Sequence, residues 1–464
     1  MDEKYLKNIR IERYINIIKF LGIPMGGTLS DQFQLGEIHG IQSIKATTKD
    51  LLVEALRVLL SMFRKKSFIV NTRVIGTWIA NKHHYRNMMV PLIEHFNKNI
   101  TVIYNPEIKN VDQLYNANFI SIKETYITPL NYIPYLIRFI SVILFAFITK
   151  RKRLNLNFRE LYYYAVLLFH QGRIIAFYDN QFKRQKNQVR LVVTEYDRNS
   201  VAAPLVLTAK KHGIKTITMV HGVIEAKGFT PLLADYIFCF GEIQKNQLVK
   251  QHVPGEKIRV TGTTIIPTFK EIERRRKQKD PVLRVCLGIS PIKQEHLNDM
   301  INTVVETVSD KSSVELIIKL HPSHMKENFI HLEEQHRNIK VLSSKEIDNM
   351  DLFGKIDLLI INFSGLGIEA MYQKVPVVLM KTHKGETGLV DLIVKWSTLP
   401  VFETSGELHS ILSRIMTDSK YLDDLSKTGK VFADKYYYAT GFEAAQNIIN
   451  ELTEITNLKG VYDV

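Results

Sequence analysis

A chain of 464 residues is too long for one domain of ordinary size and suits two. Hydrophobic residues make up 45% of it, which is enough for two buried cores and excludes global disorder. The formal net charge of +15 attracts polyanions and anionic surfaces, but there is no zinc finger, RNA-recognition signature or basic leucine-zipper pattern. Nucleic acid is therefore not an expected partner.

The two cysteines, Cys239 and Cys286, each lie inside an apolar run, so we predict that both are small buried core residues. The sequence has no disulfide framework and no zinc-ligand spacing, which fits a reducing compartment. Residues 1–7 lack the apolar region of a secretory signal. These features together predict a cytoplasmic protein.

The first predicted elements are an amphipathic helix over 50–66 that ends in three cations, a strand over 68–71, a helix over 85–96 and a strand over 100–104.

Residues 130–153 are the most unusual part of the chain. The uninterrupted apolar run, 139–149, is far shorter than the ~20 residues that a membrane-spanning helix needs. Four cations follow it at 150–153. Apolar surface beside a cationic cluster is typical of an interfacial anchor on an anionic leaflet. We therefore expect peripheral binding to the inner face of the cell membrane, and a buried core helix with a solvated basic end is the alternative.

From residue 190 strands and helices alternate regularly, which predicts a parallel α/β sheet. The helix 200–212 ends at Gly213, a favourable C-terminal residue. The expected strands are 191–194, 215–220, 236–240 and 258–261.

A polar, basic stretch at 267–281 then reads as a linker, or equally as a solvated charged helix. A second α/β unit starts after it, with a helix over 295–308 and another over 367–373. Its expected strands are 283–287, 315–320, 357–361 and 375–380. We therefore predict an N-terminal Rossmann-like domain over 1–266 and a C-terminal one over 282–464, facing a central cleft.

Three loops of the second domain directly follow strands, and ligands of open α/β sheets bind beyond the carboxyl ends of strands. The first loop carries Ser290 and Lys293, and the second carries His321 and Pro322. A His-Pro pair alone is a common turn, so its value comes from its position at a strand end.

The third loop, Asn362 to Ala370, has the clearest physical rationale. Ser364 and Gly365 open a helix, so unpaired backbone N–H groups and the positive end of the helix dipole face a ligand, and a phosphate fits there. Glu369 lies far enough into the helix to accept hydrogen bonds from a ribose diol. The alternative is an ordinary turn in which Ser364 is only the N-cap.

In the first domain, His221 follows the strand 215–220 and is our candidate general base. The glycine after it lets the backbone turn away from an approaching substrate. Glu195, Asp197 or Glu225 could orient His221 or be the base themselves, and His221 could instead be structural. The run Glu195 to Asp197 also superficially resembles a metal-binding acidic motif, but nothing else in the chain supports a metal site.

Together these segments resemble the GT-B glycosyltransferases of bacterial surface polysaccharides. The nearest group has a His-Pro motif followed by a serine motif, and it contains sialyl- and polysialyltransferases, capsule Kdo transferases and the teichoic-acid polymerases that use CDP-glycerol. Lys319-Leu-His321-Pro322 matches the first motif, and Asn362-Phe-Ser364-Gly365 matches the second. In this group the two motifs bind the phosphate of a cytidine nucleotide. The pair His221-Gly222 resembles the histidine-glycine of the teichoic-acid polymerases.

The resemblance covers roughly residues 190–400. It implies a metal-independent glycosyltransferase that uses no cofactor and moves a sugar or polyol phosphate from a nucleotide-activated donor, CMP- or CDP-linked in the relatives. The acceptor would be a growing surface glycan of capsule, lipopolysaccharide or teichoic-acid type, free or lipid-linked. In the wider GT-B pattern the residue matched by Glu369 holds the donor ribose. A nucleotide-sugar epimerase of the same fold and a non-catalytic polysaccharide-assembly protein are the alternatives.

Overall fold

The computed structural model describes residues 19–24, 47–49, 52, 72–78, 88–104, 117–122, 134, 137, 158–185, 188–224, 229–266, 282–290, 292–362, 364–382, 388–418 and 420–457. Several predicted features lie outside these ranges. They are the helix 50–66 apart from residue 52, the strand 68–71, the segment 130–153 apart from residues 134 and 137, Glu225 and the linker 267–281.

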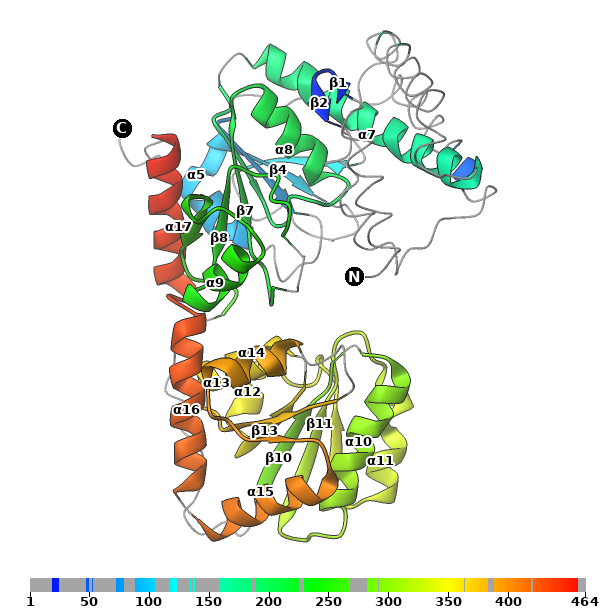
Figure 1. The fold of residues 1–464 in the computed structure, drawn as a ribbon, viewed down its shortest axis with the longest axis vertical. Helices are drawn as coiled ribbons and strands as arrows, with labels where there is room; N and C mark the ends of the chain where they lie inside the picture. The colour runs from blue at the N-terminus through cyan, green and yellow to red at the C-terminus, as the bar shows by residue number, and fades with distance from the viewer. Residues whose placement is uncertain are drawn as a thin grey trace. The chain divides into compact units, whose positions relative to one another are not determined.

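The chain forms two compact units (Figure 1). Unit 1 comprises residues 1–240, 244–265 and 441–464, and unit 2 comprises residues 241–243 and 266–440. The sequence placed 441–464 in the C-terminal domain, whereas the structure groups this segment with unit 1. The physical reason is that the buried side chains of its helix pack into a core of unit 1.

Unit 1 is built on a seven-stranded sheet with the order β5-β4-β3-β6-β7-β8-β9, in which every neighbouring pair is parallel. The strands are β3 (Val74–Trp78), β4 (Ile100–Tyr104), β5 (Asn118–Ser121), β6 (Leu191–Thr194), β7 (Lys215–Met219), β8 (Tyr236–Cys239) and β9 (Ile258–Val260). A short antiparallel pair, β1 (Lys19–Phe20) and β2 (Ile23–Pro24), also belongs to this unit.

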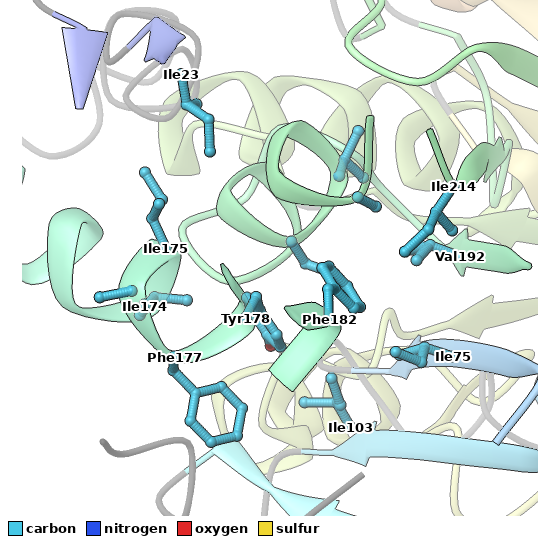
Figure 2. Packing of buried hydrophobic residues seen from close by; sticks show 14 of the residues in the cluster. Ile23, Ile75, Ile103, Ile174, Ile175, Phe177, Tyr178, Phe182, Val192 and Ile214 are labelled. Atoms are coloured by element: carbon cyan, nitrogen blue, oxygen red, sulfur yellow. The ribbon is translucent and has the colours of Figure 1, made fainter. Parts of the chain in front are cut away.

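Side chains of the unit 1 strands alternate between two cores, as the pleat of a sheet requires. Ile75 and Val192 pack into a core with helices α7 (Phe158–Arg184) and α8 (Ala202–Lys211). Their neighbours Val74 and Val193 pack into a second core with α5 (Val90–Phe96) and α17 (Gly441–Thr456). Figure 2 shows Tyr178 and Phe182 of α7 in the first core. Both faces of the sheet are covered, so its strands read as apolar runs.

Unit 2 holds a six-stranded parallel sheet with the order β12-β11-β10-β13-β14-β15. Its strands are β10 (Leu283–Gly288), β11 (Val314–Lys319), β12 (Ile339–Leu342), β13 (Leu358–Ile361), β14 (Val377–Met380) and β15 (Val401–Phe402). Its helices are α10 (Gln294–Val308), α11 (Ile330–Gln335), α12 (Asn349–Phe353), α13 (Gly365–Tyr372), α14 (Gly388–Trp396), α15 (Ser405–Thr417) and α16 (Tyr421–Tyr436). Helix α9 (Glu242–Lys250) follows β8.

Each sheet has one position where the chain reverses its direction of growth. In unit 2 the chain runs outward from β10 through β11 to β12, and then returns to the other side of β10 with β13. In unit 1 the same reversal occurs between β3 and β6. These switch points are where open α/β sheets bind ligands. The predicted fold, two Rossmann-like parallel α/β units, is confirmed.

Both cysteines are fully buried, as predicted, and neither is in a disulfide. None of the helices in the described part of the chain combines the length and the apolar run that crossing a bilayer requires.

Candidate functional site

The strand ends of unit 2 are in register at the switch point. Gly288 at the end of β10 pairs with Lys319 at the end of β11 and with Ile361 at the end of β13. Three loops therefore start side by side at one edge of the sheet. These are the three loops that the sequence singled out, the ones that carry Ser290, His321 and Ser364.

Ser364 is the N-cap of α13, and its Oγ accepts a hydrogen bond of 3.2 Å from the backbone N–H of Leu366. The next residue, Gly365, is exposed, and a Cβ there would meet no atom within 4 Å. Gly367 differs, because a Cβ at this position would overlap the side chain of Ile361 on β13. Gly367 thus lets α13 lie close against the sheet, while Gly365 leaves the helix start open to an anion.

His321 is held in a defined tautomer. The backbone N–H of Ser323 donates to its Nδ1 at 3.2 Å, and the Ser323 hydroxyl lies 2.8 Å from the same nitrogen. Because Nδ1 accepts, the proton of the neutral ring is on Nε2. Burial lowers the pKa of His321, and the neighbouring His324 lowers it further. The neutral imidazole therefore presents an N–H donor. Pro322, which lies between His321 and Ser323 in the chain, is exposed.

Ser290 and Lys293 occupy different environments. Ser290 is fully buried, and its Oγ donates to Oδ1 of the fully buried Asn362 at 3.0 Å. This hydrogen bond ties the loop after β10 to the loop after β13. Ser290 was predicted to bind the nucleotide, but its burial fits the support of the loop better. Lys293 is exposed at the N-cap of α10, without a side-chain capping bond.

Glu369 lies on α13 and is bound from a neighbouring helix. Nδ2 of Asn349, the first residue of α12, donates to its Oε2 at 2.8 Å. Burial raises the pKa of Glu369 to about 7, with the Asn349 hydrogen bond opposing and the charge of Asp348 adding to the rise. The carboxyl group is thus poised between its two protonation states near neutrality.

In unit 1 the candidate base is also fixed in one tautomer. His221 Nδ1 lies 2.9 Å from the backbone carbonyl oxygen of Glu195, which can only accept, so Nδ1 donates. In the neutral ring Nε2 then carries the lone pair that a general base needs. The backbone carbonyl oxygen of Glu195 thus orients the ring.

Two aromatic rings lie beside His221. Tyr196 lies 6.1 Å and Phe229 6.0 Å from its ring centroid, and these two rings contact each other at 5.5 Å. The turn after His221 is held by Gln244, whose amide donates to the Gly222 carbonyl at 2.9 Å. Gly222 does not have a positive φ, and a Cβ there would meet no atom within 4 Å, so neither backbone conformation nor packing requires a glycine at this position.

Asp197 has a visible structural task. It is fully buried, and its Oδ2 accepts from the backbone N–H groups of Leu233 and Ala234, both at 2.8 Å. Its neighbour Arg198, also fully buried, donates to the carbonyl of Thr230. Together they hold the segment that follows Phe229. Burial raises the pKa of Asp197, and the two backbone N–H groups oppose the rise.

A separate cavity of about 460 Å³ lies at the opposite, amino end of the unit 1 sheet, beside Arg190 before β6 and Lys215 at the start of β7. It does not include His221. Within the described ranges no group of three or more His, Cys, Asp or Glu side chains could hold a metal ion.

Sequence reasoning missed Asn349, Asn362 and Phe229. Asn349 and Phe229 come from other segments, and no local pattern links them to Glu369 or His221. Asn362 was quoted only as part of a motif. Its Nδ2 is buried without a hydrogen-bond partner in the part of the chain that the structure describes, which marks the residue as more than a turn former.

Comparisons with known proteins agree with this fold. Residues 262–454 match the family described as CDP-Glycerol:Poly(glycerophosphate) glycerophosphotransferase. No curated protein sequence matches the chain. The predicted resemblance to this superfamily of GT-B enzymes is therefore confirmed, and the match supports a transferase.

Solved structures similar to this chain share its fold at low identity. A UDP-GlcNAc 2-epimerase from Neisseria meningitidis, bound to UDP-GlcNAc, has 14% identity and a TM-score of 0.52, and the alignment covers 82% of this chain and 99% of the epimerase. A lipopolysaccharide outer core galactosyltransferase has 12% identity and a TM-score of 0.51, with 82% and 99% covered. A glycosyltransferase from Rickettsia africae has 13% identity and a TM-score of 0.51, with 84% and 99% covered. The fold is that of GT-B glycosyltransferases and related epimerases.

Proposed function

We propose that this protein transfers a sugar or polyol phosphate from a nucleotide-activated donor to a growing surface glycan. The observation that carries the proposal is the alignment of the loops of Ser290, His321 and Ser364 at the switch point of unit 2. An open helix start and a neutral imidazole donor at one sheet edge suit a phosphate ester. The glycerophosphotransferase match over residues 262–454 supports the same reaction class.

Unit 2 would bind the donor. The Ser364 hydroxyl, the backbone N–H of Gly365 and the Nε2–H of His321 would donate to the nucleotide's phosphate oxygens. Glu369 would accept from the ribose hydroxyls. As the bond between the transferred group and the phosphate breaks, negative charge grows on that phosphate. Preorganised donors stabilise such charge without a metal ion. We therefore propose that turnover persists in a chelator.

Unit 1 would supply the base. His221 Nε2 would take the proton from the acceptor hydroxyl, whose oxygen forms the new bond to the transferred group while the nucleotide leaves. The hydrogen bond from Nδ1 to the Glu195 carbonyl supports this role, because it holds the lone pair on Nε2 and stabilises the protonated ring.

A thermal-shift screen of CMP, CDP, UDP and GDP tests donor binding. A ligand that binds the native state adds RT ln(1 + [L]/Kd) to stability, about 2.7 kcal/mol at a hundredfold excess over Kd. We expect the nucleotide of the natural donor to raise the melting temperature most, with CMP or CDP favoured by the family match. No shift with any of the four would contradict a nucleotide-dependent transferase.

The epimerase fold neighbours favour a second candidate, a nucleotide-sugar epimerase. An epimerase needs no acceptor, so the two functions separate cleanly in one assay. The protein is incubated with the nucleotide sugar alone, and the sugar is followed by NMR. A new sugar epimer without any acceptor would favour the epimerase, whereas an unchanged sugar that is consumed only when acceptor glycan is added would favour the transferase.

We also propose that the protein works peripherally at the cytoplasmic face of the membrane, on the basis of the apolar run 139–149 and the cations 150–153. Replacing the four cations with Gln should reduce binding to vesicles that contain anionic lipid, and high salt should have the same effect. Wild-type protein that ignores such vesicles at low salt would contradict the anchor.

A further inference from the structure

Lys319 is a buried lysine at the edge of the candidate nucleotide site. Lys319 is the last residue of β11, two positions before His321, and the residue is only 5% exposed. Charged side chains are rarely buried without partners, because removing an ammonium group from water costs several kcal/mol. Lys319 Nζ donates to the carbonyl oxygen of Ile347 at 2.5 Å and to that of Ser343 at 3.3 Å.

Both carbonyl groups belong to the short segment 343–348, which joins β12 to α12. At its end Asp348 is the N-cap of α12 and accepts from the N–H of Asp351 at 2.9 Å. The next residue is Asn349, whose amide donates to Glu369 at 2.8 Å. A continuous path of hydrogen bonds and chain thus leads from Lys319 to the carboxyl group of Glu369.

We propose that Lys319 is a positioning residue, which fixes the segment 343–348 and thereby holds the Asn349 amide on Glu369. The ammonium group suits this task better than an apolar side chain, because it alone supplies donors to two carbonyl groups that the fold turns inward. The link to nucleotide binding rests on the proposed function, whereas the link to Glu369 does not.

Charged groups near this path act on Lys319 and Glu369. The charge of Asp348 acts on Glu369, and that of Glu369 acts on the buried Tyr437, which follows α16. Burial lowers the pKa of Lys319, and the carboxylates of Asp348 and Glu346 oppose that change. Glu346 is anchored on the outside of the segment by Lys326 at 2.7 Å, so Lys319 is the inner anchor and Lys326 the outer one.

The test follows the side-chain carboxyl carbon of Glu369 by NMR in the free protein, with Glu369→Gln assigning the signal. We expect a midpoint near pH 7 in the wild type. Lys319→Met should move the midpoint up by about one pH unit, because the Asn349 hydrogen bond that stabilises the carboxylate is lost. Asn349→Ala should do the same. Lys340→Met, which removes an exposed charge from the adjacent strand β12, should leave the midpoint unchanged.

The double variant Lys319→Met/Asn349→Ala decides how Lys319 acts. If Lys319 works through Asn349, the double variant titrates like Asn349→Ala alone. Additive shifts, or an unchanged midpoint in Lys319→Met, would overturn the proposal. Should Lys319→Met fail to fold, Lys319→Gln replaces it in the same double-variant cycle, because Gln keeps an amide N–H donor group on a shorter side chain.

Nucleotide affinity provides the second measurement. Lys319→Met should weaken the binding of the best nucleotide about tenfold, and Lys340→Met should not change it. If wild-type protein binds no nucleotide, the proposed function fails while the NMR cycle still decides the positioning role. If nucleotide binds but the Glu369 titration midpoints of the Lys319 and Asn349 variants are additive or unchanged, only the positioning role of Lys319 fails.

Discussion

The hydroxyl of Ser290 donates to Oδ1 of Asn362 at 3.0 Å, and this hydrogen bond joins the loops after β10 and β13 across the switch point of unit 2. Both residues are fully buried. Ser290→Ala leaves the Asn362 oxygen without this donor, which costs about 1–3 kcal/mol of unfolding free energy. We expect a lower melting temperature for this variant. An unchanged melting temperature would show that the Ser290 hydroxyl does not stabilise the loops.

His321 is partly exposed at the sheet edge and should affect binding more than stability, whereas Ser364→Ala also removes the N-cap bond to Leu366 and should cost about 1 kcal/mol of stability. Ser364→Ala and His321→Ala should each weaken nucleotide binding by on the order of 1.5–3 kcal/mol, the value of a hydrogen bond to a charged group. Calorimetric titration measures the affinity. Ser410→Ala, an exposed serine on α15, is the matched control. Full affinity in both variants would rule out a phosphate site at this edge.

Substitutions at two glycines of α13, Gly365 and Gly367, should separate effects on nucleotide binding from effects on stability. At Gly367 a Cβ would lie 2.9 Å from Ile361 Cγ1 and overlap Cδ1, so Gly367→Ala should cost about 1–3 kcal/mol of stability through overpacking. Ile361→Val, which removes Cδ1, should recover part of this loss. At Gly365 a Cβ meets nothing within 4 Å, so Gly365→Ala should keep stability and weaken nucleotide binding by crowding the phosphate.

Thermal unfolding and nucleotide titration of the same two variants check this prediction. The expected pattern is a stability loss at Gly367 and a binding loss at Gly365. A large stability loss in Gly365→Ala, with affinity for nucleotide retained, would reverse the assignment.

Glu369 predicts a pH dependence of stability. Its pKa rises from 4.5 to about 7 on folding, so the folded state binds more protons than the unfolded state between these values. Stability from this group is therefore full below about pH 4.5 and is lost as pH rises towards 7. At about 1.36 kcal/mol for each pH unit, the loss is on the order of 3 kcal/mol.

Glu369→Gln cannot titrate and should remove this part of the pH dependence. Unfolding free energies at about pH 5 and pH 8 measure it, and the exposed Asp351→Asn on α12 is the control. Equal pH dependence in wild type and Glu369→Gln would mean that the carboxyl group is not desolvated as the structure indicates.

Apolar periodicity was enough to predict much of the fold. The strand 191–194 matches β6, and the strands around 215–220 and 283–287 match β7 and β10 to within one residue at either end. Each is a buried run bounded by polar or glycine residues, which local sequence reports well. The loops after these strands were found for the same reason, since a strand end fixes where a loop begins.

The parts that were missed depend on tertiary contacts. The central strand β3 contains Gly76, a weak strand former, whose place is explained by Met89 of the segment before α5, 3.1 Å from where a Cβ would lie. The apolar face of α17 does not by itself indicate whether the helix packs into unit 1 or unit 2. Its packing into a core of unit 1 could therefore not be predicted from its sequence. Asn349 and Glu369 lie on different helices, 20 residues apart in sequence, and no local sequence pattern predicts their contact.

The last prediction concerns the proposed base. His221→Ala should lower turnover by ~10²–10⁴, the usual contribution of general-base catalysis, and leave nucleotide affinity unchanged, because the donor is proposed to bind unit 2. Loss of the Nδ1 bond to the Glu195 carbonyl, together with ring contacts to Tyr196 and Phe229, should also cost some stability, so turnover is compared at a temperature where the variant is folded. His252→Asn is the control, since His252 is exposed and Asn tolerates its φ of 66°.

The competing bases make separate predictions. Asp197→Ala frees two buried N–H groups and should mainly destabilise unit 1, so a stable but inactive Asp197→Ala protein would point to Asp197 as the base. Glu195→Gln keeps the backbone carbonyl that orients His221 and should retain most turnover. Near-normal turnover in folded His221→Ala would end the assignment of His221, while the nucleotide site on unit 2 would stand unaffected.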